Sequence, residues 1–300
     1  MDITKLKTVA EGAVDKYKEE LNELSQAIWS VPELNFSEHS AHRVLTEFLE
    51  KAGLKVERNF ILETGFRATY GDDDSSKPNI CVICEYDALP EIGHACGHNL
   101  IAEVGVATGL AIKAAMNASQ VPLGKVTVLG TPAEEGGGGK IDLINAKVFD
   151  DIDVAMMSHP STYDYAKPPT PSINQLVDYR FDDRPYSSLI SNKTIVGLFE
   201  TNAAEAGIEL WDEPDPRTGS TDMGNVSHVV PRIHPMYSIG GKAANHTKEF
   251  TTDSGSAVAQ SFTLKQAKVL EYTALDIYSR PELLKQIKQD FIKDLKNALS

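Results

Sequence analysis

Residues of types that bind metal ions lie in short segments spread over this 300-residue chain. In the segment GHACGHN, Cys96 and His98 are two residues apart, so in extended backbone their side chains point to the same side. A thiolate and an imidazole side by side suit a zinc-like ion. A short Cys/His cluster is weak evidence by itself. His159 and His246 are single histidines, each of which is also compatible with a surface position.

Two adjacent glutamates, Glu134 and Glu135, follow an apolar segment in LGTPAEEGGGG. Neighbouring side chains in a loop diverge, so one carboxylate can bind a metal ion while the other faces a water molecule. Hydrolytic metal sites need this combination of a Lewis acid and a general base. The alternative is a solvated pair of charges, which is the commoner meaning of an isolated Glu-Glu.

The whole set is large enough for two metal ions. Two four-coordinate ions need roughly eight bonds. A bridging Cys96 thiolate and a bridging water molecule would supply half of them. His98, Glu135, His159 and His246 would supply the rest, and Glu134 would stay free as the base.

Hydrophobic periodicity predicts helices that alternate with strands. The expected helices cover 14–29, 38–52, 99–116, 140–147 and 193–207, with two more between about 254 and 298. The expected strands cover 54–60, 65–71, 79–85, 125–130, 153–158, 226–230 and 233–239. This alternation predicts an α/β fold with a mostly parallel, mixed sheet flanked by helices. Gly105 and Gly109 on one face of helix 99–116 would let it lie close to the sheet.

Three of the expected strands end just before candidate residues of the metal site. Asp87 follows strand 79–85, Glu134 and Glu135 follow strand 125–130, and His159 follows strand 153–158. Ligands of open α/β sheets bind beyond the carboxyl ends of the strands. The sequence therefore predicts one site at this edge of the sheet.

Composition narrows the range of partners and compartments. The formal net charge of −14 disfavours nucleic acid, because phosphate backbones would repel the chain. No run reaches the roughly 18 consecutive apolar residues of a membrane span, so we expect no membrane partner. The start MDITKLKTVAEG has no apolar signal segment, and three cysteines are an odd number. We therefore expect a cytoplasmic protein.

The segments YDALPEIGHACGHN, TPAEEGGGGK, MMSHP, GSTDMGNVSHVVP and NHT resemble, in this order, the zinc aminoacylase/amidohydrolase metallopeptidases of peptidase family twenty. The resemblance covers residues 14–160 and about 190–298. It implies that two metal ions bind at the positions listed next: Cys96, His98, Glu135, His159 and His246. It also implies that Glu134 is the general base and that Asp87 supports the site.

The resemblance implies a small dipeptide or N-acyl amino acid as substrate. A thiolate ligand favours zinc, with manganese and cobalt as alternatives. Within GSTDMGN, Ser220, Thr221 and Asp222 are candidates for substrate contact, and His234 is another.

The chain departs from this family where a lid domain of roughly a hundred residues would be inserted. We expect a catalytic domain made of residues 1–160 and 191–300, with 161–190 as a linker-like remnant of the lid. No histidine occurs from 160 to 227, so the lid histidine that steadies the oxyanion in this family is missing. Losing one such donor typically costs on the order of 100- to 1,000-fold in rate. A metal-binding pseudoenzyme is therefore the alternative, and the family's homodimer would be weakened or lost.

Overall fold

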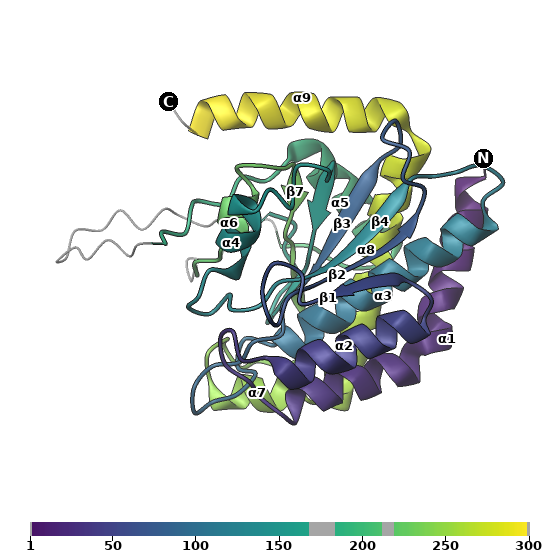
Figure 1. The fold of residues 1–300 in the computed structure, drawn as a ribbon. Helices are drawn as coiled ribbons and strands as arrows, with labels where there is room; N and C mark the ends of the chain where they lie inside the picture. The colour runs from purple at the N-terminus through teal and green to yellow at the C-terminus, as the bar shows by residue number, and fades with distance from the viewer. Residues whose placement is uncertain (1, 168–183, 212–218, 299–300) are drawn as a thin grey trace.

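A six-stranded mixed sheet runs through the described part of this computed structural model, which comprises residues 2–167, 184–211 and 219–298 (Figure 1). Its strand order is β1 (Lys55–Arg58), β2 (Phe66–Gly71), β4 (Lys125–Gly130), β3 (Asn79–Cys84), β5 (Val154–Met156) and β7 (Arg232–Ile233). The last four strands are parallel, whereas β2 runs antiparallel to both of its neighbours. The expected mostly parallel, mixed sheet is confirmed.

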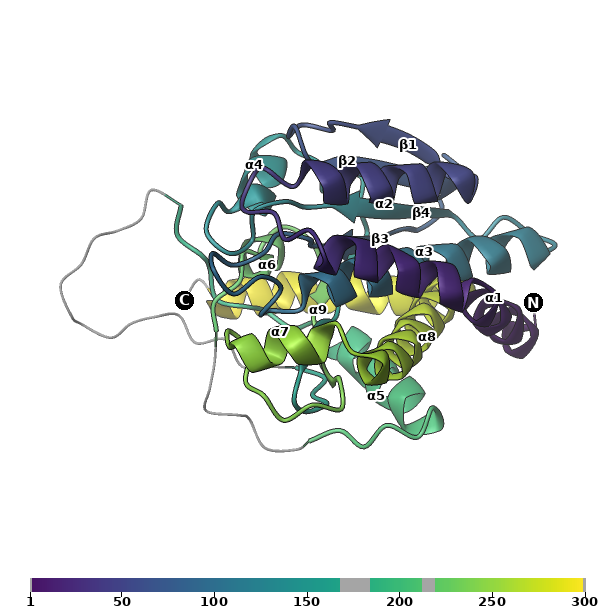
Figure 2. The ribbon, with the colours of Figure 1, turned by 90° about the horizontal axis from the view of Figure 1, so that it is seen from below.

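Nine helices surround the sheet within the described ranges. They are α1 (Ile3–Trp29), α2 (His39–Lys51), α3 (His98–Ala118), α4 (Gly139–Asn145), α5 (Lys193–Glu205), α6 (Met223–Val226), α7 (Lys248–Ser254), α8 (Ala257–Ser279) and α9 (Pro281–Ala298). Helix α3 lies directly on β3 and β4, and α1 and α8 pack against it (Figure 2). A Cβ atom at Gly105 would collide with Cys84 Sγ, and one at Gly109 with Val128 Cγ2. These glycines therefore allow the close approach of α3 to the sheet.

The opposite face of the sheet carries a smaller core under α4 and α6. Side chains alternate along β3, so Cys81 packs into this smaller core and Cys84 into the larger one. Burial raises the pKa of both thiols. Both cysteines are therefore packing residues and not a redox pair.

Two expected strands near the C-terminal half are wrong in detail. The predicted strand 226–230 is the end of the short helix α6 and a turn, because Val226 and Val230, four residues apart, both pack into the smaller core. The predicted strand 233–239 is divided into β7 and β8 (Met236–Ser238). Pro235 between them has no N–H to donate, and β8 pairs instead with β6 (His159–Ser161).

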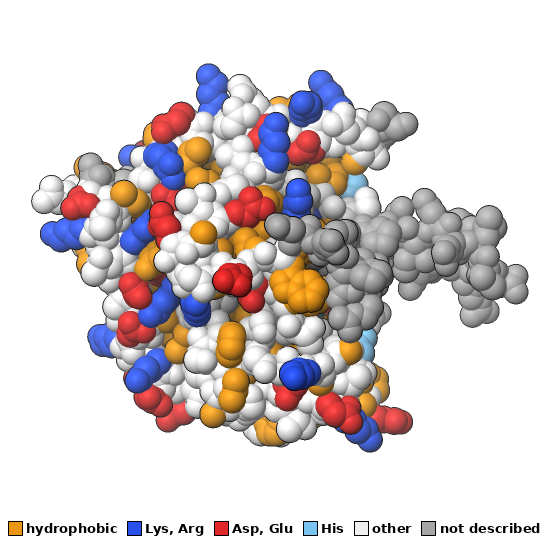
Figure 3. Space-filling model, turned by 180° about the vertical axis from the view of Figure 1, so that it is seen from behind, with side chains coloured by type: hydrophobic (Ala, Val, Ile, Leu, Met, Phe, Trp, Pro, Cys, Tyr) orange, Lys and Arg blue, Asp and Glu red, His pale blue; other side chains and the backbone are white. Residues whose placement is uncertain are grey.

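Helix α3 is long and apolar enough to cross a membrane, and 83% of its most apolar window is buried inside the protein. Its place against the sheet makes it a core helix. On the side away from the view of Figure 1, acidic and basic side chains are interspersed (Figure 3). The predicted remnant 161–190 lies mostly outside the described residues, since 168–183 are not among them.

Candidate metal centre and active site

Residues of the predicted site converge at the carboxyl ends of β3, β4 and β5. Asp87 lies in the loop after β3, the Glu134–Glu135 pair in the loop after β4, and His159 just after β5. His98 is the first residue of α3. Gly97 before it has φ +77°, a left-handed conformation that glycine adopts at little cost, and this turn starts the helix.

Asp87 fixes two members of the cluster at once. Its buried carboxylate accepts a hydrogen bond from His98 Nδ1 (2.9 Å) through Oδ1 and one from the backbone N–H of Glu135 (2.9 Å) through Oδ2. The bond to Nδ1 leaves His98 Nε2 facing the cluster. A carboxylate behind a metal-binding histidine typically sets its tautomer and ring orientation. Asp87 therefore has the geometry of a supporting residue.

Cys96 belongs to two groups of side chains that can each hold a metal ion. Cys96, His98 and His159 form one group, and Cys96, Glu135 and His246 form the other, with the ligand atoms of each group within 4.8 Å of one another. Cys96 Sγ lies 3.3 Å from His159 Nε2, and His246 Nε2 lies 3.7 Å from Glu135 Oε2. One thiolate is thus placed between two potential ion positions.

The chemistry of this cluster fits divalent cations. His98 Nε2 and Glu135 Oε1 are buried and have no hydrogen-bond partner among the described residues. His159 Nδ1 donates to the carbonyl of Pro160 (2.8 Å), which leaves Nε2 directed to the cluster. Soft sulfur, imidazole nitrogen and carboxylate oxygen together form a donor set typical of zinc.

The protein shifts the pKa values of His159 and His98 in opposite directions. Burial, helped by the nearby His98, lowers the pKa of His159 to about 4, so its imidazole is neutral and can donate a lone pair at neutral pH. Burial also opposes protonation of His98, but the Asp87 carboxylate outweighs it and raises the His98 pKa well above its usual value. The structure therefore favours a positive charge at Nε2, whether a proton or a metal ion carries it.

Glu134 is buried beside the ligand groups, with Oε2 3.8 Å from His98 Nε2. Burial and then the negative charge of Glu85 raise the pKa of Glu134 well above its usual value. A carboxyl group with a raised pKa can both accept and return a proton near neutral pH. A raised pKa is a property that a general base needs, and the role of Glu134 as that base stays a prediction.

A buried ion-pair network below the cluster was missed from the sequence. Lys140 Nζ lies 2.6 Å from Glu85 Oε1 and 2.6 Å from Asp222 Oδ1, and the three side chains are at most 1% exposed. Glu85 Oε2 faces His98 Nε2 at 3.6 Å. The available signals were an acidic residue two positions before Asp87 and a lysine after the glycine run.

Glu38 is a second residue that sequence reasoning missed. It is buried, its Oε1 accepts the backbone N–H of Ala133 (3.0 Å), and its Oε2 accepts the Thr64 hydroxyl (2.7 Å). Ala133 has φ +62°, an uncommon conformation for a residue with a side chain. Glu38 therefore holds the loop that carries Glu134.

The four candidates for substrate contact lie in different surroundings. Ser220 is exposed, whereas the Thr221 hydroxyl accepts the backbone N–H of Met223 (3.1 Å). Asp222 is completely buried, and both of its carboxylate oxygens accept bonds from Lys140, so the structure gives it an interior partner. His234 is buried, and its ring centroid lies 5.8 Å from that of His159.

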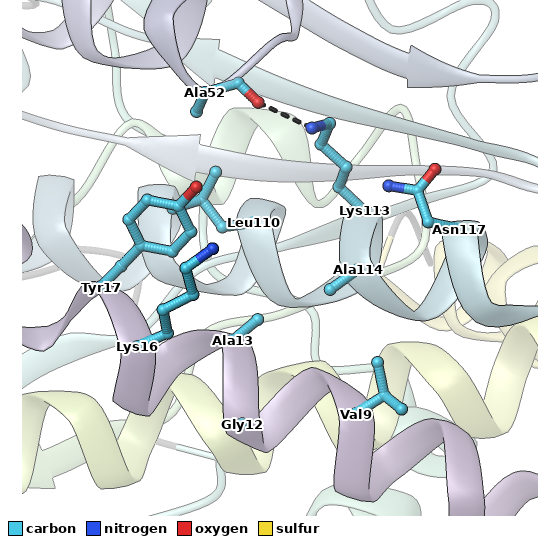
Figure 4. Close-up of a pocket in the computed structure, with 10 residues that line it drawn as sticks. All are labelled: Val9, Gly12, Ala13, Lys16, Tyr17, Ala52, Leu110, Lys113, Ala114 and Asn117. Carbon is cyan, nitrogen blue, oxygen red and sulfur yellow. Dashed lines mark hydrogen bonds between the residues drawn. The ribbon is translucent and has the colours of Figure 1, made fainter.

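A hollow of about 380 Å³ lies elsewhere, between α1 and α3 (Figure 4). It is lined by small and apolar side chains together with Lys16, Tyr17, Lys113 and Asn117, and it holds no cysteine, histidine or carboxylate. Lys113 Nζ donates to the carbonyl of Ala52 (2.7 Å) and so caps the end of α2. This hollow has no group that could hold a metal ion.

Comparison with known proteins gives a family match. Residues 83–264 match the model of peptidase family M20/M25/M40. The chain is 35% identical to Xaa-Arg dipeptidase of Mus musculus, over 95% of this chain and 92% of that protein. It is 28% identical to thermostable carboxypeptidase 2 of Saccharolobus solfataricus, over 50% of this chain and 43% of that protein.

Solved structures give the same fold. A dinuclear metal binding peptidase from Bacillus subtilis superimposes with a TM-score of 0.71 at 14% identity, over 88% of this chain and 99% of that one. The alignment with the mouse dipeptidase spans 396 positions, whereas this chain has 300 residues. At least 96 positions of the mouse dipeptidase alignment therefore have no counterpart here.

Proposed function

This chain belongs to peptidase family M20/M25/M40 and is a hydrolase, and from that premise we propose that it cleaves the amide bond of small dipeptides or N-acyl amino acids at a centre of two divalent metal ions. The observation that carries the proposal is the place of Cys96 in two of the three possible ligand groups among the described residues, the third being Glu85, His98 and Glu134. His98 and His159 complete one group, and Glu135 and His246 complete the other.

Two divalent ions at these residues would polarise the carbonyl of the scissile amide and acidify a water molecule. Glu134 would take a proton from that water as the water oxygen bonds to the carbonyl carbon, and it would return the proton to the amine nitrogen as the C–N bond breaks. Asp87 keeps His98 Nε2 turned to the centre, and Glu38 keeps the loop before Glu134 in place. Zinc is the ion that best suits a shared thiolate, with manganese and cobalt as alternatives.

We also propose that the catalytic domain is made of residues 1–160 and 191–300 and lacks most of the lid. The unmatched positions in the dipeptidase alignment support this proposal. β7 from the second half pairs with β5 from the first, so both halves contribute to one sheet. A lid is thus not required to complete this sheet.

The test is hydrolysis by the purified 300-residue chain loaded with zinc, manganese or cobalt. The panel contains dipeptides, including ones with a C-terminal arginine such as the name of the mouse relative specifies, and N-acyl amino acids. We expect turnover of at least one class, which stops with a chelator and returns when the metal is restored. Bound metal without turnover of any class would contradict the proposal and favour the pseudoenzyme alternative.

A further inference from the structure

Arg232 in β7 is a buried arginine that has no hydrogen-bond partner in the part of the chain that the structure describes. Its side chain is 1% exposed, and Nε, Nη1 and Nη2 have no hydrogen-bond partner among the described residues. Burial alone lowers its pKa to about 9, so the guanidinium still carries its charge at neutral pH. Buried charges in proteins are almost always paired, because an isolated one is costly. An anion beside this guanidinium would pair the buried charge and offset its cost.

His234 connects this arginine to the metal-ligand cluster. It lies two residues further along an extended segment, so its side chain is on the same side as that of Arg232. Its two ring nitrogens are also buried and without a hydrogen-bond partner among the described residues. Its ring lies against that of His159. His234 thus places an unpartnered side chain beside the proposed catalytic centre, and Arg232 precedes it by two residues on the same side of the strand.

The two carboxylates of the ion-pair network on the same side of the sheet face other cations, since Glu85 Oε2 lies 3.6 Å from His98 Nε2. Glu85 and Asp222 already accept short bonds from Lys140. An anion bound at Arg232 would supply the partner that the buried guanidinium lacks among the described residues.

We propose that Arg232 and His234 form an anion subsite that receives the carboxylate of the substrate's amino acid. This inference rests on the proposed function, in which the substrate is a small molecule that ends in a carboxylate. A guanidinium binds a carboxylate through two parallel hydrogen bonds, and a neutral imidazole can add one more. Because the guanidinium is closed to solvent, we expect the ligand to displace neighbouring side chains when it binds.

Removing the charge of Arg232 distinguishes two roles. The melting temperature of the ligand-free protein falls if the arginine is structural, and it does not fall if the arginine serves only to bind a ligand. We expect Arg232→Met to keep or raise the melting temperature of the ligand-free protein, since an unpaired buried charge is removed. Arg67→Met is the matched control in the same sheet. Arg67 is paired with Glu57 (2.8 Å), and its removal should lower the melting temperature. A large decrease for Arg232→Met would show that Arg232 has a structural role and would overturn the inference.

Binding is then measured by calorimetry on the zinc-loaded protein, with L-alanine, L-leucine and L-arginine, each beside its amide. We expect the wild type to prefer the free carboxylate, and Arg232→Met to bind it about 10- to 100-fold more weakly while amide binding stays the same. Arg232→Lys keeps the positive charge but loses the two parallel N–H donors of the guanidinium, so its affinity for the carboxylate should lie between those of the wild type and Arg232→Met. Sodium chloride and sodium acetate serve as simple-anion probes.

Equal binding of amino acids and amides by the wild type, or an unchanged preference in Arg232→Met, would overturn the inference. So would the same Arg232-dependent binding of chloride as of amino acids, because the site would then be an inorganic-anion site. These readouts need no turnover. If the wild type hydrolyses a substrate and Arg232→Met keeps the preference for carboxylate over amide, only the subsite is contradicted. If carboxylate binding depends on Arg232 but no substrate is hydrolysed, only the proposed reaction is contradicted.

Discussion

Glu134→Gln should lower the turnover number by about 100- to 10,000-fold and leave the metal content of the protein unchanged. Glutamine has the shape of glutamate but cannot take up a proton, so the variant removes the base alone. The loss should therefore be confined to the chemical step. Steady-state kinetics with the best substrate of the panel and metal analysis of the same sample measure both effects.

The adjacent residue is the matched comparison. Glu135→Gln changes the same chemical group one position along the loop, but Glu135 belongs to a ligand group with Cys96 and His246. We expect this variant to bind less metal. The assignment of roles fails if Glu134→Gln stays fully active, or if it loses as much metal as Glu135→Gln does.

Lys140→Met should lower the free energy of unfolding by about 3–5 kcal/mol, because it leaves Glu85 and Asp222 buried without their cation. Burial already raises the pKa of Asp222 to about 6 even with Lys140 beside it, so the carboxylate depends on this partner. Urea unfolding of the whole chain, followed by circular dichroism, measures the difference.

Lys18→Met is the control for this variant. Lys18 forms an exposed pair with Glu19 (3.7 Å), and exposed pairs contribute little, so its removal should change stability by less than about 1 kcal/mol. Adding Glu85→Gln and Asp222→Asn to Lys140→Met should recover part of the loss, since the uncompensated charges are then removed. A loss for Lys140→Met no larger than for Lys18→Met would contradict the account.

The sequence predicted the location of the site because strand ends are strong local signals. The buried strands before Asp87, Glu134 and His159 are apolar runs with clear ends, and parallel strands bring those ends to one edge. The two-residue spacing of Cys96 and His98 also pointed to the same cluster, but the extended backbone assumed for it is wrong, because Gly97 has φ +77° and His98 begins α3. The roles of these residues stay predictions until the metal and the kinetics are measured.

Other features depend on contacts between distant segments, which the sequence does not reveal. Lys140 follows β4, Glu85 follows β3 and Asp222 precedes α6, so their network exists only after folding. The lack of a hydrogen-bond partner for Arg232 among the described residues likewise becomes visible only in the folded chain. Local patterning alone also misread Val226 and Val230 as a strand, although their shared core requires a helical turn.

The measurement that tests the central claim most directly is the metal content of the purified chain, determined by mass spectrometry for the wild type and Cys96→Ser. If Cys96 is shared by two ions, the wild type holds two divalent ions per chain and Cys96→Ser holds fewer. Cys81→Ala, a change at a buried cysteine outside the cluster, should keep both. A wild type without metal, or a Cys96→Ser variant that holds two ions as tightly, would contradict the proposed centre.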